Sequence, residues 1–159
     1  MLSESINTLR FLQGYVDNQL AEISDDDFYS QPVDGANHAA WNLGHTAYYL
    51  DQHIAMIGGG PQLEAWKETF GQHSTPTTGP DGYPSREEII SAWREAGNRL
   101  IAAVEAASDE QLTAPNPNSM ADAFPTVGDF LAFSLATHSA LHVGQISMWR
   151  RLVGQAAMF

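Results

Sequence analysis

Residues 127–153, VGDFLAFSLATHSALHVGQISMWRRLV, decide the fold, because their apolar positions repeat with the period of an α-helix. At about 100° per residue, one stripe of this helix is mostly apolar and must face the protein interior. The segment therefore predicts a long helix with two histidines on its buried face. The stripe consists of Val127, Leu131, Leu135, His138, Leu141, His142, Gln145, Trp149 and Leu152.

Helical periodicity also covers residues 3–23, 37–57 and 86–107, whereas strand-like alternation is nearly absent. Ser85 with Glu88, and Thr126 with Asp129, have the sequence of a capping box at a helix start. The run 58–61, three glycines and a proline, ends the second helix because neither residue type favours its continuation. We expect an all-α protein in which residues 58–84 form a crossover with a short helix near 63–70.

Composition limits what the chain can do. Its 159 residues suit one domain, 1–159, and a net charge of −12 opposes binding to nucleic acid or anionic lipid. No stretch approaches the roughly 20 apolar residues of a membrane span, and no signal pattern opens the sequence, so a soluble cytoplasmic protein is expected. Because cysteine is absent, any metal must be held by nitrogen and oxygen.

His138 and His142 are four residues apart on the predicted interior face, so both imidazoles can reach one ion. The alternative is a pair of core histidines that form hydrogen bonds with the backbone or with Gln145. Ser139 stands where the zinc-protease helix motif has glutamate. A metalloprotease is therefore not expected.

The second helix has a polar stripe, and its opposite stripe is apolar. Residues 38–57 contain a single charged residue, Asp51, where a solvated stripe would carry several. We therefore expect both faces to be buried and the polar one to line an interior pocket. The polar stripe is His38, Asn42, His45, Tyr49 and Gln52, and the apolar one is Leu43, Ala47, Leu50, Ile54 and Ile57.

His45 is the candidate third ligand, but other histidines compete with it. His38 lies two turns away on nearly the same face, His53 is rotated by about 80° from it, and His73 belongs to a loop-rich region. Helix geometry alone leaves His38 open. Three imidazoles without a carboxylate leave coordination positions free, which is typical of a catalytic site.

The segments Trp41-Asn42-Leu43-Gly44-His45 and His138-Ser-Ala-Leu-His142-Val-Gly144-Gln145, with the preceding residues 32–37, resemble the DinB-like superfamily. The resemblance implies a four-helix bundle with a long crossover between the second and third helices. It also implies one divalent metal on His45, His138 and His142, which favours His45 over His38, and frequently a homodimer.

Relatives of this kind are metal-dependent enzymes that use small-molecule thiols, so the resemblance implies an S-transferase or a related hydrolase or isomerase with an electrophilic second substrate. The metal would hold the thiol as thiolate. Zinc and nickel are the ions expected after purification, with manganese and iron as alternatives. Tyr49, Asn42 and Gln145 are candidates for orienting the substrate. The competing hypotheses are a non-catalytic metal-binding or sensor protein and a metal-free bundle with structural histidines.

Two further expectations concern packing. Trp41 and Trp149 are assigned to the core, with the wall of the pocket as the alternative. The second face of the last helix carries small residues that permit close approach of a neighbouring helix or of a twofold partner, and we expect it to be buried. That face consists of Ala132, Ala136, Ala140, Val143, Gly144 and Ser147.

Overall fold

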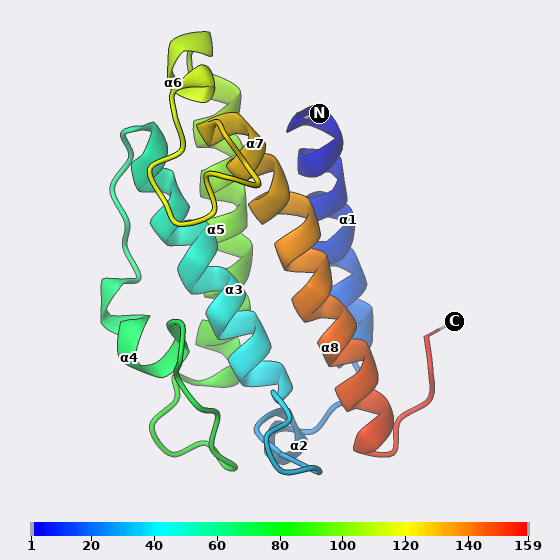
Figure 1. Ribbon diagram of the computed structural model, residues 1–159. Helices are drawn as coiled ribbons and strands as arrows, with labels where there is room; N and C mark the ends of the chain where they lie inside the picture. The colour runs from blue at the N-terminus through cyan, green and yellow to red at the C-terminus, as the bar shows by residue number, and fades with distance from the viewer. Residues whose placement is uncertain (1, 159) are drawn as a thin grey trace.

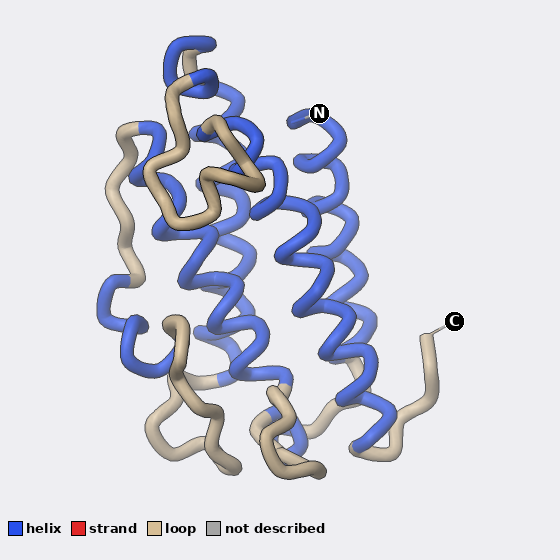
Figure 2. The backbone as a smooth tube through the Cα atoms, in the orientation of Figure 1, coloured by secondary structure: helices blue, strands red, loops and turns tan. Residues whose placement is uncertain are grey.

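Helices make up the regular structure of residues 2–158, the part of the chain that the computed structural model describes. Between these residues no β-strand forms, apart from one isolated bridge between Pro115 and Thr126 (Figure 2). The all-α prediction is confirmed. The elements are α1 (Leu2–Leu20), α2 (Asp25–Phe28), α3 (Ala39–His53), η1 (Ile54–Ile57), η2 (Glu64–Trp66), α4 (Lys67–Phe70), α5 (Arg86–Ala106), α6 (Asp109–Thr113), α7 (Val127–Ala132), η3 (Phe133–His138) and α8 (Ser139–Leu152).

Four long helical segments lie side by side: α1, α3, α5 and the continuous run from α7 through η3 to α8 (Figure 1). Helix α3 packs against both α5 and α8, and α8 also packs against α1. The connection from α3 to α5 carries η2 and α4 and contacts α3. Within residues 2–158, every helix is too short or too polar to cross a membrane.

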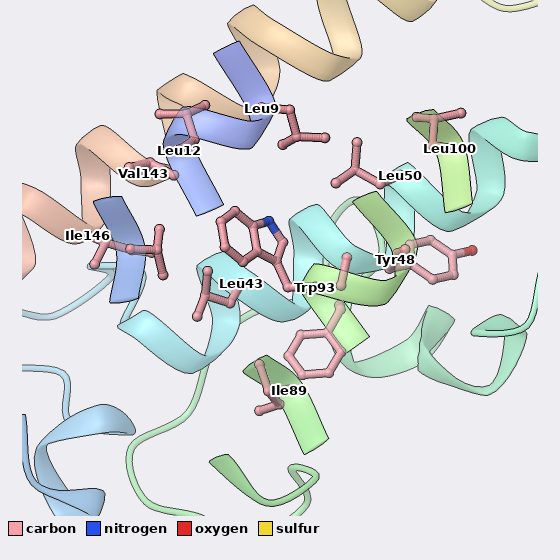
Figure 3. Close-up of a cluster of buried hydrophobic side chains, with 14 of the residues drawn as sticks. Leu9, Leu12, Leu43, Tyr48, Leu50, Ile89, Trp93, Leu100, Val143 and Ile146 are labelled. Atoms are coloured by element: carbon pink, nitrogen blue, oxygen red, sulfur yellow. The ribbon is translucent and has the colours of Figure 1, made fainter. Parts of the chain in front are cut away.

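The core lies where the four long segments meet. Trp93 of α5 is fully buried and occupies the centre of the cluster in Figure 3. Each long segment contributes apolar side chains from one face, as the helical periodicity predicts. The labelled side chains of this cluster are Leu9 and Leu12 of α1, Leu43, Tyr48 and Leu50 of α3, Ile89, Trp93 and Leu100 of α5, and Val143 and Ile146 of α8.

The predicted capping boxes are present at the starts of α5 and α7. The Ser85 N–H donates to Oε2 of Glu88 at 2.8 Å, and the Glu88 N–H donates to Oγ of Ser85 at 3.3 Å. Thr126 and Asp129 make the same reciprocal pair. Both helices therefore begin where their sequence requires, because each box satisfies two backbone donors that the helix leaves free.

Asp51, the single charged residue of the second predicted helix, is fully buried on α3. Its carboxylate accepts the backbone N–H groups of Gln62 and Leu63, each at 2.9 Å from Oδ2, and forms an ion pair with Arg99 of α5. These contacts fix the start of the long connection against α3 and α5. A buried carboxylate is tolerated here because it is paired and hydrogen-bonded.

The last long helix differs from its prediction, because residues 133–138 form a π-helix. A π turn contains more residues than an α turn, so it rotates every later residue relative to a regular helical projection. Leu141 and Leu152, predicted to face inward, are 58% and 45% exposed, and Gln145 is also exposed. Val143 and Ile146 are buried in their place.

The small-residue face of the last helix shows the effect of the same rotation. Val143 is buried, but Ala140 and Gly144 are exposed in the single chain. Of the two neighbours considered for this face, a helix of the same chain therefore does not cover all of it, and coverage by a twofold partner stays a prediction.

Candidate metal centre

Three histidines from two neighbouring helices converge in the interior. One ring nitrogen each from His45 of α3, His138 at the end of η3 and His142 of α8 lie within 4.8 Å of one another. The ring centroids are 4.6 Å apart for His45 and His142, and 4.8 Å apart for His138 and His142. The structure thus brings together the three residues predicted as ligands, at a spacing that suits one shared ion.

Two of the three rings have a fixed tautomer. Nδ1 of His45 lies 2.7 Å from the carbonyl oxygen of Phe70, and Nδ1 of His142 lies 2.9 Å from Oδ1 of Asn42. Both partners accept only, so each Nδ1 carries the hydrogen and each Nε2 keeps a free lone pair. Histidines that bind metals usually donate their second N–H to such an acceptor.

Asn42 presents its oxygen to His142 because its amide nitrogen is already engaged. Nδ2 of Asn42 donates to the carbonyl oxygens of Asn37 and His38, at 3.0 Å and 3.1 Å. The side chain is fully buried and cannot turn over without losing both bonds. Asn42 therefore orients the His142 ring through the hydrogen bond to its Nδ1.

His138 is held differently. Its Nδ1 is buried and has no hydrogen-bond partner among residues 2–158. A buried polar atom without a partner costs free energy, so such atoms are rare unless an ion or ligand satisfies them. A cation bound at this nitrogen would supply a partner of this kind, and a set of three imidazoles fits one.

The protonation state of the cluster also suits a cation. Burial lowers the pKa of His45 to about 4 and that of His142 to about 3, and repulsion from neighbouring imidazolium groups contributes to both. Burial likewise lowers the pKa of His138. The imidazoles are therefore neutral near pH 7, which is the form that binds metals.

Gly44 and Trp41 explain why His45 is held so firmly. A Cβ atom on Gly44 would overlap the ring of Phe70, so the glycine lets Phe70 approach α3 and bring its carbonyl oxygen to His45. Trp41 stacks on the His45 ring with centroids 4.5 Å apart, and its Nε1 donates to Oγ of Ser74 at 2.9 Å. Trp41 thus supports a site residue as well as being buried, whereas Trp149 is a core residue.

Comparison with known proteins identifies the family. The sequence profile of the DinB superfamily matches residues 8–146, which is most of the chain. The chain belongs to the DinB superfamily. None of the curated proteins compared with it matches.

In this DinB-superfamily chain, the other histidines lie outside the cluster. Nδ1 of His38 accepts the Trp41 N–H at 3.1 Å and caps α3, and its Nε2 lies 3.1 Å from the carbonyl oxygen of Thr77. Both nitrogens of His38 are therefore occupied, which removes it as a competitor of His45. His73 is exposed, with a φ of 72°.

A cavity of about 360 Å³ opens beside the cluster of this DinB-superfamily site. His45, His138 and Tyr49 are among the residues that line it. The hydroxyl of Tyr49 accepts the backbone N–H of Gln72 at 2.9 Å, so its own hydrogen remains free to donate. The other lining residues are apolar, Met120, Phe130 and Phe133, or uncharged and polar, His53, Gln72, Asn118 and Ser119.

The three candidates for substrate orientation differ in position. Tyr49 lines the cavity, whereas Asn42 is buried behind His142 and is not part of the lining. Gln145 is exposed, and its Oε1 accepts from Nδ2 of Asn37 at 2.9 Å. Sequence reasoning missed Phe70, whose role rests on a backbone oxygen and leaves no side-chain signature.

Proposed function

We propose that this protein is a metal-dependent enzyme that binds one divalent cation through His45, His138 and His142 and uses a small-molecule thiol, as an S-transferase or a related hydrolase or isomerase. The observation that carries the proposal is the convergence of three neutral imidazoles, two of them fixed through Nδ1, beside a cavity that His45 and His138 line. Membership of the DinB superfamily agrees with it.

A dication bound by three neutral nitrogens keeps its positive charge and open coordination positions, and it would hold a thiol as the nucleophilic thiolate. The residues of the chain supply the rest of the site. Phe70 and Asn42 hold the imidazoles in place, and the Tyr49 hydroxyl can donate a hydrogen bond to a substrate in the cavity. Phe130 and Phe133 exclude water from one wall.

Several finer statements belong to the same proposal. We interpret the four side-by-side segments as a single four-helix bundle domain with a long crossover between α3 and α5. Zinc and nickel are the ions expected in purified protein, with manganese and iron as alternatives, since imidazole suits all four. The proposal also includes an electrophilic second substrate and a cytoplasmic location, where low-molecular-weight thiols stay reduced.

Metal titration tests the ligand set. Purified protein should bind one equivalent of Zn²⁺ or Ni²⁺, measured by competition with a chromophoric chelator, and His142→Ala should abolish binding. The matched control is His73→Asn, which changes an exposed histidine outside the cluster to a residue that tolerates its positive φ. Undiminished binding by His142→Ala would contradict the assignment.

Turnover assays separate an enzyme from a sensor. Metal-loaded protein is tested with cysteine, glutathione and coenzyme A against electrophiles such as 1-chloro-2,4-dinitrobenzene, with His142→Ala as the blank. Rates above the blank support the transferase. Stoichiometric metal binding with only background rates for every pair would favour the alternative, a non-catalytic metal-binding or sensor protein.

A further inference from the structure

His53 lines the cavity but does not belong to the three-histidine cluster. Its Nδ1 lies 2.8 Å from Oγ of Ser134, a fully buried residue of the π-helix. The Ser134 hydroxyl makes no other hydrogen bond with residues 2–158. Because a buried hydroxyl hydrogen needs an acceptor, Ser134 donates to Nδ1 of His53.

This bond fixes which nitrogen of His53 carries the hydrogen. Burial lowers the pKa of His53 to about 3, so the ring is neutral near pH 7 and its single hydrogen lies on Nε2. Nε2 forms no hydrogen bond with the described residues and is not among their buried polar atoms that lack a partner. It is therefore an accessible N–H donor in the cavity wall.

The surroundings of this donor carry no formal charge. Among the described residues that line the cavity, none is aspartate, glutamate, lysine or arginine. Phe130 meets the His53 ring edge-on, with centroids 4.8 Å apart, and Phe133 lies beside Phe130 with centroids 6.1 Å apart. Flat apolar walls with one oriented donor suit a neutral, partly aromatic molecule, and no side chain of the lining offers an ion pair to a charged one.

We propose that this cavity binds an uncharged aromatic or apolar compound with a carbonyl-type oxygen, and that Nε2–H of His53 donates a hydrogen bond to that oxygen. The inference rests on the proposed function in one respect: such a compound would be the electrophile that meets the thiol. His53 would then be a positioning and specificity residue, outside the metal ligand set.

A pair of matched probes tests the donor. Acetophenone and α-methylstyrene have the same shape, but only acetophenone has a carbonyl oxygen. Wild-type protein, stripped of metal with a chelator, should bind acetophenone about two- to tenfold more tightly, the value of one neutral hydrogen bond, as measured by ligand-detected NMR titration. His53→Phe should bind both probes equally.

Two further variants keep the test decisive. Met120→Leu changes an apolar wall residue and should alter both affinities alike, so the preference for acetophenone remains. Ser134→Ala removes the hydroxyl that keeps the hydrogen of His53 on Nε2, so it should reduce the preference for acetophenone. This variant provides a second readout if His53→Phe does not fold. A preference that survives in His53→Phe, or in Ser134→Ala where His53→Phe does not fold, would overturn the inference, and so would no binding of acetophenone to wild type. Since the titration needs neither metal nor turnover, it can succeed when the proposed enzymatic function fails.

Discussion

Oδ1 of Asn42 lies 2.9 Å from Nδ1 of His142, so a residue of α3 sets the tautomer of a histidine on α8. Asn42 is fully buried and is itself held by two backbone carbonyl oxygens. This contact links the two helices that carry the cluster. It makes Asn42 a positioning residue for His142.

Replacing Asn42 with leucine removes the acceptor while nearly preserving the volume of the side chain. We expect Asn42→Leu to weaken metal binding by about 10- to 100-fold, the usual effect of losing the hydrogen-bond partner of a ligand. Competition with a chromophoric chelator measures the change. Asn98→Leu, at an exposed position of α5, should bind metal like wild type. Equal affinity of both variants would refute a positioning role.

Gly44 directly precedes His45, and Gly144 lies two residues after His142. The structure nevertheless gives the two glycines opposite roles. A Cβ on Gly44 overlaps the Phe70 ring, whereas nothing lies within 4 Å of a Cβ on Gly144. We expect Gly44→Ala to lower the free energy of unfolding by about 1–3 kcal/mol through overpacking. Gly144→Ala should raise it by about 0.5–1 kcal/mol, because alanine favours a helix over glycine.

Urea unfolding of the two alanine variants measures this difference. Gly44→Ala should also weaken metal binding, because displacement of Phe70 moves the carbonyl oxygen that holds His45. Two variants of equal stability would show that Phe70 can move aside at little cost.

The sequence was sufficient for those features that depend on neighbours within one helix. The helix positions, the capping boxes of Ser85 and Thr126, and the convergence of His138 with His142 all follow from local spacing. Burial of both faces of α3 followed from its lack of charge. His45 could be preferred over His38 only through the family resemblance, since the Thr77 contact of His38 spans 39 residues.

The remaining features depend on contacts that no local pattern encodes. The apolar residues of Phe133–His138 are as compatible with an α-helix as with the π-helix that forms. A projection at a constant angle therefore places Leu141 inside, although this side chain is exposed. The partner of His45 is a backbone oxygen 25 residues away. The need for glycine at position 44 follows only from the contact of the Phe70 ring with α3.

Large apolar side chains are exposed on α1 and on α8, the helix that follows the π-helix. Phe11, Leu141 and Met148 are 64%, 58% and 57% exposed. We expect a second copy of the chain to cover this surface, in line with the homodimer implied by the resemblance. Sedimentation velocity should then show a dimer for wild type and a monomer for Phe11→Glu.

Val33→Glu provides the control for that experiment. Val33 is 52% exposed and belongs to the connection between α2 and α3 rather than to α1 or α8. It should remain dimeric. A monomeric wild type, or a Phe11→Glu variant that still dimerises, would refute the expected interface.

Buried histidines also predict how metal-free protein responds to acid. Burial lowers the pKa of His38 and His45 to about 4, and that of His53 and His142 to about 3, from an ordinary value near 6.5. Between pH 6.5 and pH 4, the unfolded chain binds protons that the native protein excludes. The free energy of unfolding should therefore be highest above pH 6.5 and fall as the pH is lowered through this range.

His38→Asn isolates one contribution to this effect, because asparagine can still cap α3 but does not titrate. Urea unfolding at pH 7.5, 6.0 and 5.0, with a chelator present, gives the slope of stability against pH. Each excluded proton contributes up to about 1.4 kcal/mol per pH unit, so the slope of His38→Asn should be lower than that of wild type by at most this amount. Identical slopes would mean that His38 takes up its proton as readily in the native protein as in the unfolded chain. The burial of His38 against Thr77 and Trp41 makes protonation of the native protein unfavourable, so we expect the slopes to differ.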